Sequence, residues 1–112
     1  MTSSRAPAPE KRQEVYTLLV EAGRAEGDGL PDGATGAALM CYAAASDEEE
    51  AVRETVAILR QADLNVLEVS GYGALAEREA EGHDIGPEDR ALMARASDEN
   101  AVIVAQITPF FD

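Results

Sequence analysis

The chain has 112 residues, 46% of them hydrophobic, and a formal net charge of −13 at pH 7. This length predicts one domain built around one hydrophobic core. The negative charge disfavours nucleic acid and anionic membrane surfaces as partners, because both require a basic face.

The longest apolar run without a charge, residues 101–111, is shorter than the roughly twenty residues that a membrane-spanning helix needs. Residues 1–13 carry charges with no apolar stretch behind them, unlike a secretory signal. We therefore expect a cytoplasmic protein that does not enter membranes. The single cysteine, Cys41, and the single histidine, His83, are too few for a zinc cage. We expect no metal and no cofactor.

The charge is unevenly placed along the chain. Residues 1–13 hold three bases and one acid, a net +2, whereas the remainder holds 21 acids and 6 bases, a net −15. We expect residues 1–12 to be a disordered tail and residues 13–112 to form a single α+β domain. The acidity of this body is typical of a soluble protein in a salty cytoplasm, or of one that binds a basic protein partner.

The first periodic segment, Val15 to Ala22, alternates apolar and mixed positions. Tyr16, Leu18 and Val20 share one side of such a strand, and its β-branched and aromatic content favours the strand. A helix from Pro9 to Ala22, ended by Gly23, is the competing interpretation.

Residues 23–36 are rich in glycine and predict a loop. The apolar run Ala37 to Ala45 then predicts a second strand, which pairs antiparallel with the first. Cys41 lies in the middle of this strand, where a cysteine acts as a small hydrophobic residue.

Four acidic residues, Asp47 to Glu50, follow this strand. Ser46 and Glu49 have the spacing of a capping box, and acids in a first turn favour the helix dipole. The acidic run therefore predicts the start of a helix rather than a metal site. An apolar stripe continues the helix to about Ala62–Asp63: Val52, Val56 and Leu59.

The segment Asn65 to Ser70 predicts a third strand with Leu67 and Val69 inward, followed by a turn at Gly71 to Gly73. Polar residues 74–86 predict irregular structure with one helical turn at Leu75–Ala80. Pro87 suits the first position of a second helix, which ends near Asn100. The run Ala101 to Thr108 is the most apolar strand and is predicted to be central.

The resulting order is β-β-α-β-α-β. In a chain this short, we expect both helices on one face of a four-stranded sheet, a two-layer α/β sandwich of the α+β class. This arrangement is similar to the ferredoxin-like (α/β plait) class of small domains. It departs from the strict ferredoxin-like order, because the first helix is missing or the first strand is displaced.

Three side chains are candidates for a ligand site: Tyr16, Tyr72 and His83. Tyr72 stands at a strand end, where pockets of open α/β sheets form. His83 has Asp84 beside it, and a histidine–carboxylate pair is a candidate general base. An exposed loop histidine and a tyrosine packed on the domain edge are the simpler interpretations. The glycine-rich segments lack the lysine and the spacing of phosphate loops.

The terminal aromatic pair, Phe110 and Phe111, is a candidate for a subunit interface, because aromatic residues are enriched there. The alternatives are that both side chains pack on the protein's own core, or that they belong to a tail with no contact role.

The sequence favours a non-enzymatic binding or regulatory module that acts as a homodimer, since no catalytic constellation stands out. Such a module would take a small apolar ligand. The first alternative is a cofactor-free enzyme of the dimeric α+β barrel type, with His83, Tyr72 and Tyr16 in its pocket. The second is an acidic inhibitor-like or immunity-like module that masks a basic partner.

Overall fold

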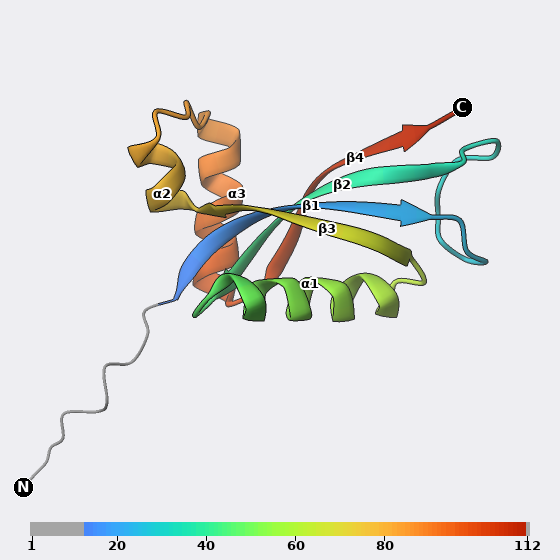
Figure 1. Cartoon of the computed structure of the whole chain (residues 1–112), viewed down its shortest axis with the longest axis horizontal. Coiled ribbons are helices and arrows are strands. Elements are labelled where there is room, and N and C mark those ends of the chain that lie inside the picture. Colours follow the sequence, from blue (N-terminus) through green and yellow to red (C-terminus); the bar gives the residue numbers. More distant parts are fainter. Residues whose placement is uncertain (1–12, 112) are drawn as a thin grey trace, which may run out of the picture.

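The computed structural model describes residues 13–111, so the expected tail, residues 1–12, lies outside the described part. Four strands form one antiparallel sheet in the order β3-β1-β2-β4 (Figure 1). The strands are β1 Glu14–Gly23, β2 Gly36–Ala45, β3 Asn65–Ala74 and β4 Val102–Phe110. The helices are α1 Glu48–Gln61, α2 Leu75–Ala80 and α3 Pro87–Glu99.

The centre of the sheet is the hairpin of β1 and β2. Leu18 pairs with Cys41 in its register, and both side chains are fully buried. The strand interpretation of residues 15–22 is therefore confirmed over the helical one. Alternation along β1 sends Leu18 and Val20 to one face of the sheet and Val15 and Thr17 to the other.

The α+β class, with helices packed on a four-stranded sheet, is confirmed. The expectation that both main helices share one face is wrong. Leu59 of α1 packs with Val20, whereas Met93 of α3 packs with Val15 and Tyr42 on the opposite face. Both faces of the β1–β2 hairpin are apolar, so each face supports a helix of its own.

The resemblance to ferredoxin-like domains lies in one unit of the chain. Strands β2 and β3 are each antiparallel to β1, which lies between them, so β2–α1–β3 is a split crossover unit of the ferredoxin-like kind. The full strand order differs, because here the two central strands are neighbours in sequence. The ferredoxin-like order itself is therefore not reproduced.

The acidic run does begin α1, but the capping pair is shifted by one residue from the expected Ser46 and Glu49. Asp47 is the N-cap, and its Oδ1 accepts the Glu50 backbone N–H at 2.8 Å. The Glu50 carboxylate reaches back to the Ser46 N–H at 2.8 Å. Both bonds satisfy backbone groups around the first turn.

Strand β4 lies at an edge of the sheet, so its predicted central position is wrong. The β1–β2 hairpin occupies the centre, and the two helical connections leave only the outer positions for β3 and β4. The strand is apolar because its side chains pack on both faces of the sheet. Val102 packs toward α1, and Ile103 packs toward α3.

Strand β3 runs through Gly71 to Gly73 and ends at Ala74, beyond the predicted turn. Val69 packs on the core as expected, but Leu67 is 63% exposed. A register shift against β1 between Glu21 and Ala22 changes the alternation, and Val66 packs in place of Leu67.

The loop after β1 is organised by one carboxylate. Asp28 accepts N–H groups of Ala25 at 2.8 Å and Leu30 at 2.9 Å, and its Oδ2 pairs with Arg24 Nε at 2.9 Å. The Arg24 bond, followed by these backbone bonds, lowers the pKa of Asp28 to about 2.

Within residues 13–111, no helix has the length and apolar character that crossing a membrane requires.

Candidate functional site

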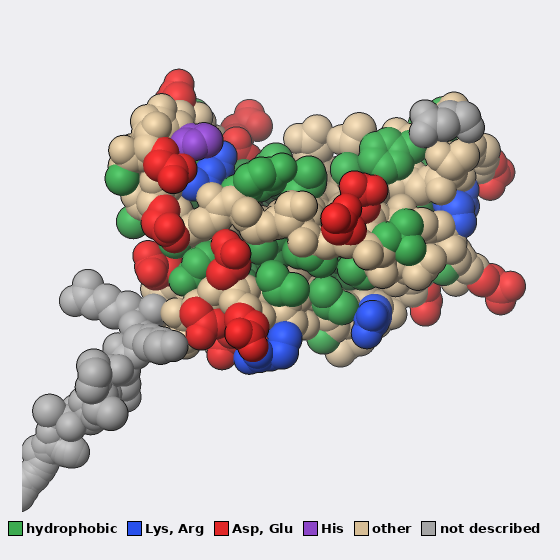
Figure 2. Space-filling model, viewed as in Figure 1, with side chains coloured by type: hydrophobic (Ala, Val, Ile, Leu, Met, Phe, Trp, Pro, Cys, Tyr) green, Lys and Arg blue, Asp and Glu red, His purple; other side chains and the backbone are tan. Residues whose placement is uncertain are grey.

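A pocket of about 350 Å³ opens on the α3 face of the sheet. Three strands, α2 and the turn after α2 contribute to it. In Figure 2 the histidine and a basic side chain lie together at the upper left, beside a row of hydrophobic side chains. The lining residues are Thr17, Leu19, Met40, Tyr72, Arg78, Glu81 and His83.

The floor of the pocket is apolar. Leu19 of β1 and Met40 of β2 are register partners on the central hairpin, and both are half-buried. They share a face with Val15 and Tyr42, which are buried in the cluster that α3 covers. The central strands therefore continue, with the same apolar alternation, into a part of the face that α3 leaves open.

Tyr72 forms one wall of the pocket. Its side chain is 51% exposed on the edge strand β3. The next residue, Gly73, has a φ of 92°, a backbone conformation that favours glycine. At this point the chain leaves β3 for α2, which packs on both β3 and β1. This reversal is what brings residues of α2 to the same pocket as Tyr72.

Arg78 of α2 is the basic group of the pocket. Its Nη1 donates to Thr17 Oγ1 at 2.9 Å, and Thr17 is 1% exposed on the central strand. The Arg78 Nε is buried without a hydrogen-bond partner. The pocket contains a cation that forms no ion pair with any carboxylate of the described residues.

The rim carries the only histidine. His83 Nε2 lies 3.5 Å from Glu81 Oε1, and both side chains are largely exposed. The His83 backbone N–H donates to the Arg78 carbonyl at 3.0 Å, which fixes the turn to the end of α2. The carboxylate beside His83 is therefore Glu81 and not the expected Asp84.

Two of the three ligand-site candidates, Tyr72 and His83, line this one pocket. Tyr16 does not, because it is 7% exposed and buried on the α1 face with Leu18 and Ala51. Burial raises the pKa of Tyr16, and neighbouring carboxylates, Glu14 first, raise it further.

Sequence reasoning missed Arg78. A signal was present, because Arg78 is the single basic residue of residues 61–89, a segment otherwise rich in acids. A lone arginine among acids is easily taken for a solvated partner of its neighbours. Only the fold shows that it lies over Thr17, 61 positions earlier in the chain.

Cys41 of β2 faces α1, on the side of the sheet away from this pocket, and is not suited to act as a nucleophile. It is completely buried, and burial raises the pKa of its thiol to about 11, so the thiolate needed for nucleophilic chemistry is disfavoured. No three His, Cys, Asp or Glu side chains of the described chain gather in a way that could hold a metal ion.

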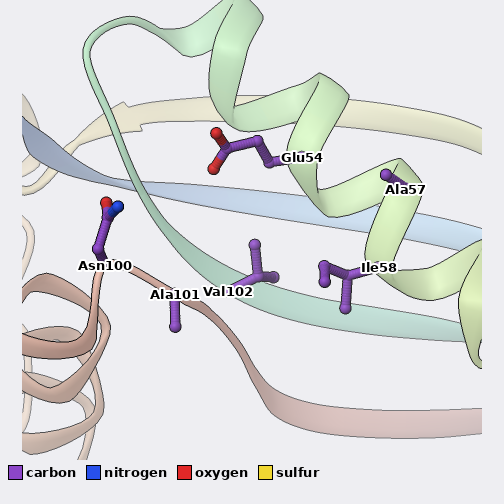
Figure 3. A pocket seen from close by; sticks show the side chains of 6 residues that line it. All are labelled: Glu54, Ala57, Ile58, Asn100, Ala101 and Val102. Atoms are coloured by element: carbon purple, nitrogen blue, oxygen red, sulfur yellow. The ribbon is translucent and has the colours of Figure 1, made fainter.

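A second, more open cavity of about 370 Å³ lies between α1 and the start of β4. Ile58 and Val102 point toward one another across it (Figure 3). The other lining residues are Glu54, Ala57, Asn100 and Ala101.

Exposed apolar side chains continue along β4 from this cavity. Val104 is 38% and Ile107 is 51% exposed. Of the aromatic pair, Phe110 is half-buried and outside the three core clusters, and Phe111 is 62% exposed.

Fold and pocket together define a small α+β sandwich with an apolar-floored pocket on one face of its sheet. The chain belongs to the family described as a domain of unknown function (DUF8846), whose model matches residues 15–111. Comparisons with curated proteins and with solved structures found no match.

Proposed function

We propose that this protein is a non-enzymatic binding module of the cytoplasm that works as a homodimer. Its site is the pocket on the α3 face, and its ligand is a small molecule with an apolar body. The observation that carries this proposal is the placement of Tyr72, His83 and Arg78 around the apolar floor of Leu19 and Met40.

The composition of the pocket supports ligand binding. Small-molecule sites are mostly apolar, with a few polar groups that fix orientation, and they begin at about 300 Å³. This pocket, at about 350 Å³, combines an apolar floor with one guanidinium and one imidazole. The Tyr72 ring is half exposed and free to lie against a ligand.

A cofactor-free enzyme is the second candidate, and the His83–Glu81 pair favours it. A carboxylate beside an imidazole supports general-base chemistry. The geometry favours binding over catalysis, because Thr17, whose hydroxyl is the one that could act as a nucleophile in the pocket, is 1% exposed and accepts a bond from Arg78. A His83→Ala variant separates the two ideas. If the protein is an enzyme, the variant abolishes turnover of a substrate that the unaltered protein converts; if it is a binding module, the unaltered protein binds its ligand and converts none.

Methyl NMR of methionine tests the pocket directly. The chain has three methionines: Met40 lines the pocket, Met93 is buried under α3, and Met1 lies outside the described residues. In a screen of small aromatic and aliphatic compounds, binders should shift the Met40 methyl signal and leave Met93 nearly unchanged. Tyr72→Ala should weaken these compounds, whereas Leu67→Ala, at an exposed position of the same strand, should not.

The outcomes of this screen are distinct. Hits that move Met40 and depend on Tyr72 support the pocket. Hits that move Met93 instead, or a screen in which no compound moves Met40, contradict it.

Homodimer formation is supported by the edge strand β4. Unprotected sheet edges pair with other strands, and proteins usually block them with charges. Strand β4 carries no charged residue, although the chain has a net charge of −13. The opposite edge strand, β3, carries Glu68.

The partner that best fits this strand edge is a second copy of the chain. Most of the other surface segments carry acidic residues, and bringing these together in two copies costs free energy. Along β4 the apolar side chains of Val104 and Ile107 face a partner without that repulsion. Pro109 lies near the strand end and leaves residues 102–108 to pair around a two-fold axis. Phe111, just beyond, extends the apolar strip.

A further inference from the structure

We propose that the ligand of the α3-face pocket is a small monocarboxylic acid, whose carboxylate binds Arg78 and whose apolar body lies on Leu19 and Met40. This inference deepens the proposed function and rests on it. It assigns the chemical class of the ligand and names Arg78 as the residue that selects it.

The hydrogen bonds of Arg78 leave part of its guanidinium without a protein acceptor. Nη1 donates to Thr17 Oγ1 at 2.9 Å, the buried Nε has no partner, and Nη2 donates to no acceptor in the described part of the chain. Donors held away from water without an acceptor cost free energy. A planar carboxylate matches the fork of a guanidinium and removes this cost.

The acidic neighbours of Arg78 in sequence are engaged elsewhere. Glu77 Oε1 accepts the Ala74 backbone N–H at 3.1 Å and so caps α2. Glu79 Oε2 pairs with Arg90 at 2.6 Å and so ties α2 to α3. Helix residues one position apart do not face each other, so neither flanking carboxylate lies against Arg78. Glu81, which lines the same pocket, lies 3.5 Å from His83 Nε2 and forms no ion pair with Arg78 among the described residues.

Most other arginines of the described residues, unlike Arg78, have a carboxylate partner. Arg24, Arg53, Arg90 and Arg95 each pair with a carboxylate. Arg60 has no such partner within the described residues, but it stands exposed on α1, where water solvates it. Among the arginines of residues 13–111, Arg78 combines the lack of an ion pair with a place in the α3-face pocket.

The surroundings limit the ligand to one negative charge. The pocket offers a single arginine, and Glu81 stands at its rim. The net charge of −13 adds a field that repels dianions and phosphates. One carboxylate balances Arg78, and the remainder of the ligand faces Leu19, Met40 and Tyr72, which favour an apolar and preferably flat group.

A matched pair of probes tests this inference. Phenylacetate and phenylacetamide have nearly the same shape, but only the first is charged. Both are titrated against the Met40 methyl signal of the full chain at neutral pH. We expect phenylacetate to bind at least roughly tenfold more tightly, the effect of about one charge-assisted hydrogen bond.

Two variants locate the effect. Arg78→Gln should bring the affinity of phenylacetate down to that of phenylacetamide. Arg60→Gln, which removes the other arginine of residues 13–111 that lacks an ion pair, should leave the difference intact. The comparison of the two probes in the unaltered protein does not depend on whether the Arg78 variant folds.

The experiment distinguishes an error in the carboxylate assignment from an error in the proposal that this pocket binds ligands. If phenylacetamide binds as tightly as phenylacetate, the carboxylate assignment is overturned, while the apolar pocket stands. If the difference survives in a folded Arg78→Gln variant, Arg78 is not the selecting residue. If neither probe moves Met40, and no compound of the wider screen does, both proposals fall.

Discussion

Arg78 and Thr17 are 61 positions apart in the chain, and the Arg78 guanidinium donates to the Thr17 hydroxyl at 2.9 Å. This bond joins α2 to the central strand β1 at the base of the pocket. It fixes one end of a side chain that is otherwise flexible, and so presets the direction in which the positive charge points. Preorganisation of this kind lowers the entropy cost of holding a ligand.

The first prediction concerns this bond. Thr17→Val keeps the shape of the side chain but removes the acceptor, and Thr17→Ser keeps the acceptor. Because Thr17 is 1% exposed, we expect the valine variant to lower the free energy of unfolding by about 1 kcal/mol. Urea denaturation measures this change. Equal stability of the valine variant and the unaltered protein would show that the bond contributes nothing.

The second prediction concerns Thr55 of α1, which is completely buried. Its hydroxyl has no hydrogen-bond partner among the described residues. Thr55→Val replaces an unsatisfied polar group with a methyl group, so the free energy of unfolding should rise by about 1 kcal/mol. Thr55→Ser, which keeps the hydroxyl and opens a small cavity, should lower it. A destabilised valine variant in thermal or urea unfolding would mean that the hydroxyl is satisfied.

The third prediction concerns two glycines in strands. A Cβ at Gly36 would lie 2.5 Å from the Ala22 carbonyl oxygen, which is backbone and cannot move freely. Gly36→Ala should therefore lower the free energy of unfolding by about 1–3 kcal/mol. At Gly71 the three atoms nearest to an added Cβ all belong to the end of the Glu48 side chain, which can turn aside. Gly71→Ala is thus the matched control, and a similar loss in both variants would disprove the explanation.

The fourth prediction concerns pH and Asp28. Its pKa is about 2 in the folded protein, against an ordinary value of 3.8. Since the folded state favours the ionised form, Asp28 contributes stability at neutral pH that is lost as the pH falls from about 4 toward 2. The stability difference between the unaltered protein and Asp28→Asn should shrink over that interval. A difference that stays constant in urea denaturation across this pH range would contradict the role of the Arg24–Asp28 network.

The fifth prediction concerns the β4 edge. Ile107→Lys places a charge in the proposed interface, where Ile107 is 51% exposed, and should convert dimer to monomer. Leu67→Lys makes the same change at a 63% exposed site on the opposite edge strand and should leave the dimer intact. Sedimentation velocity measures both masses. A dimer that persists in the Ile107 variant would place the interface elsewhere.

Local patterns predicted much of the fold. Alternation in residues 15–22 identified β1, and the acidic run identified the start of α1, since both signals act over a few residues. The face on which each helix packs was not predictable in this way. Val15 and Tyr42 are buried and apolar like the residues on the α1 face. The alternation therefore does not show whether the second helix packs on the same face as the first or on the opposite one.

The site was predictable only in part, for a similar reason. Tyr72 stood out by its place between glycines at a predicted strand end, and His83 stood out as the single histidine with a carboxylate beside it. Arg78 did not, because its place in the pocket depends on its contact with Thr17, 61 positions earlier in the chain, which only the fold creates. The apolar character of β4 was recognised, but apolar strands occur at the centre of a sheet and at an edge that meets a partner.

Native mass spectrometry of the gently purified protein tests the account of a ligand-binding homodimer most directly, because it reports the assembly and any bound small molecule together. The account predicts a dimer whose subunits each carry a small additional mass. In the Tyr72→Ala variant, a smaller fraction of the subunits should carry that mass. A monomer with no additional mass, at concentrations well above those of the binding titrations, would contradict it.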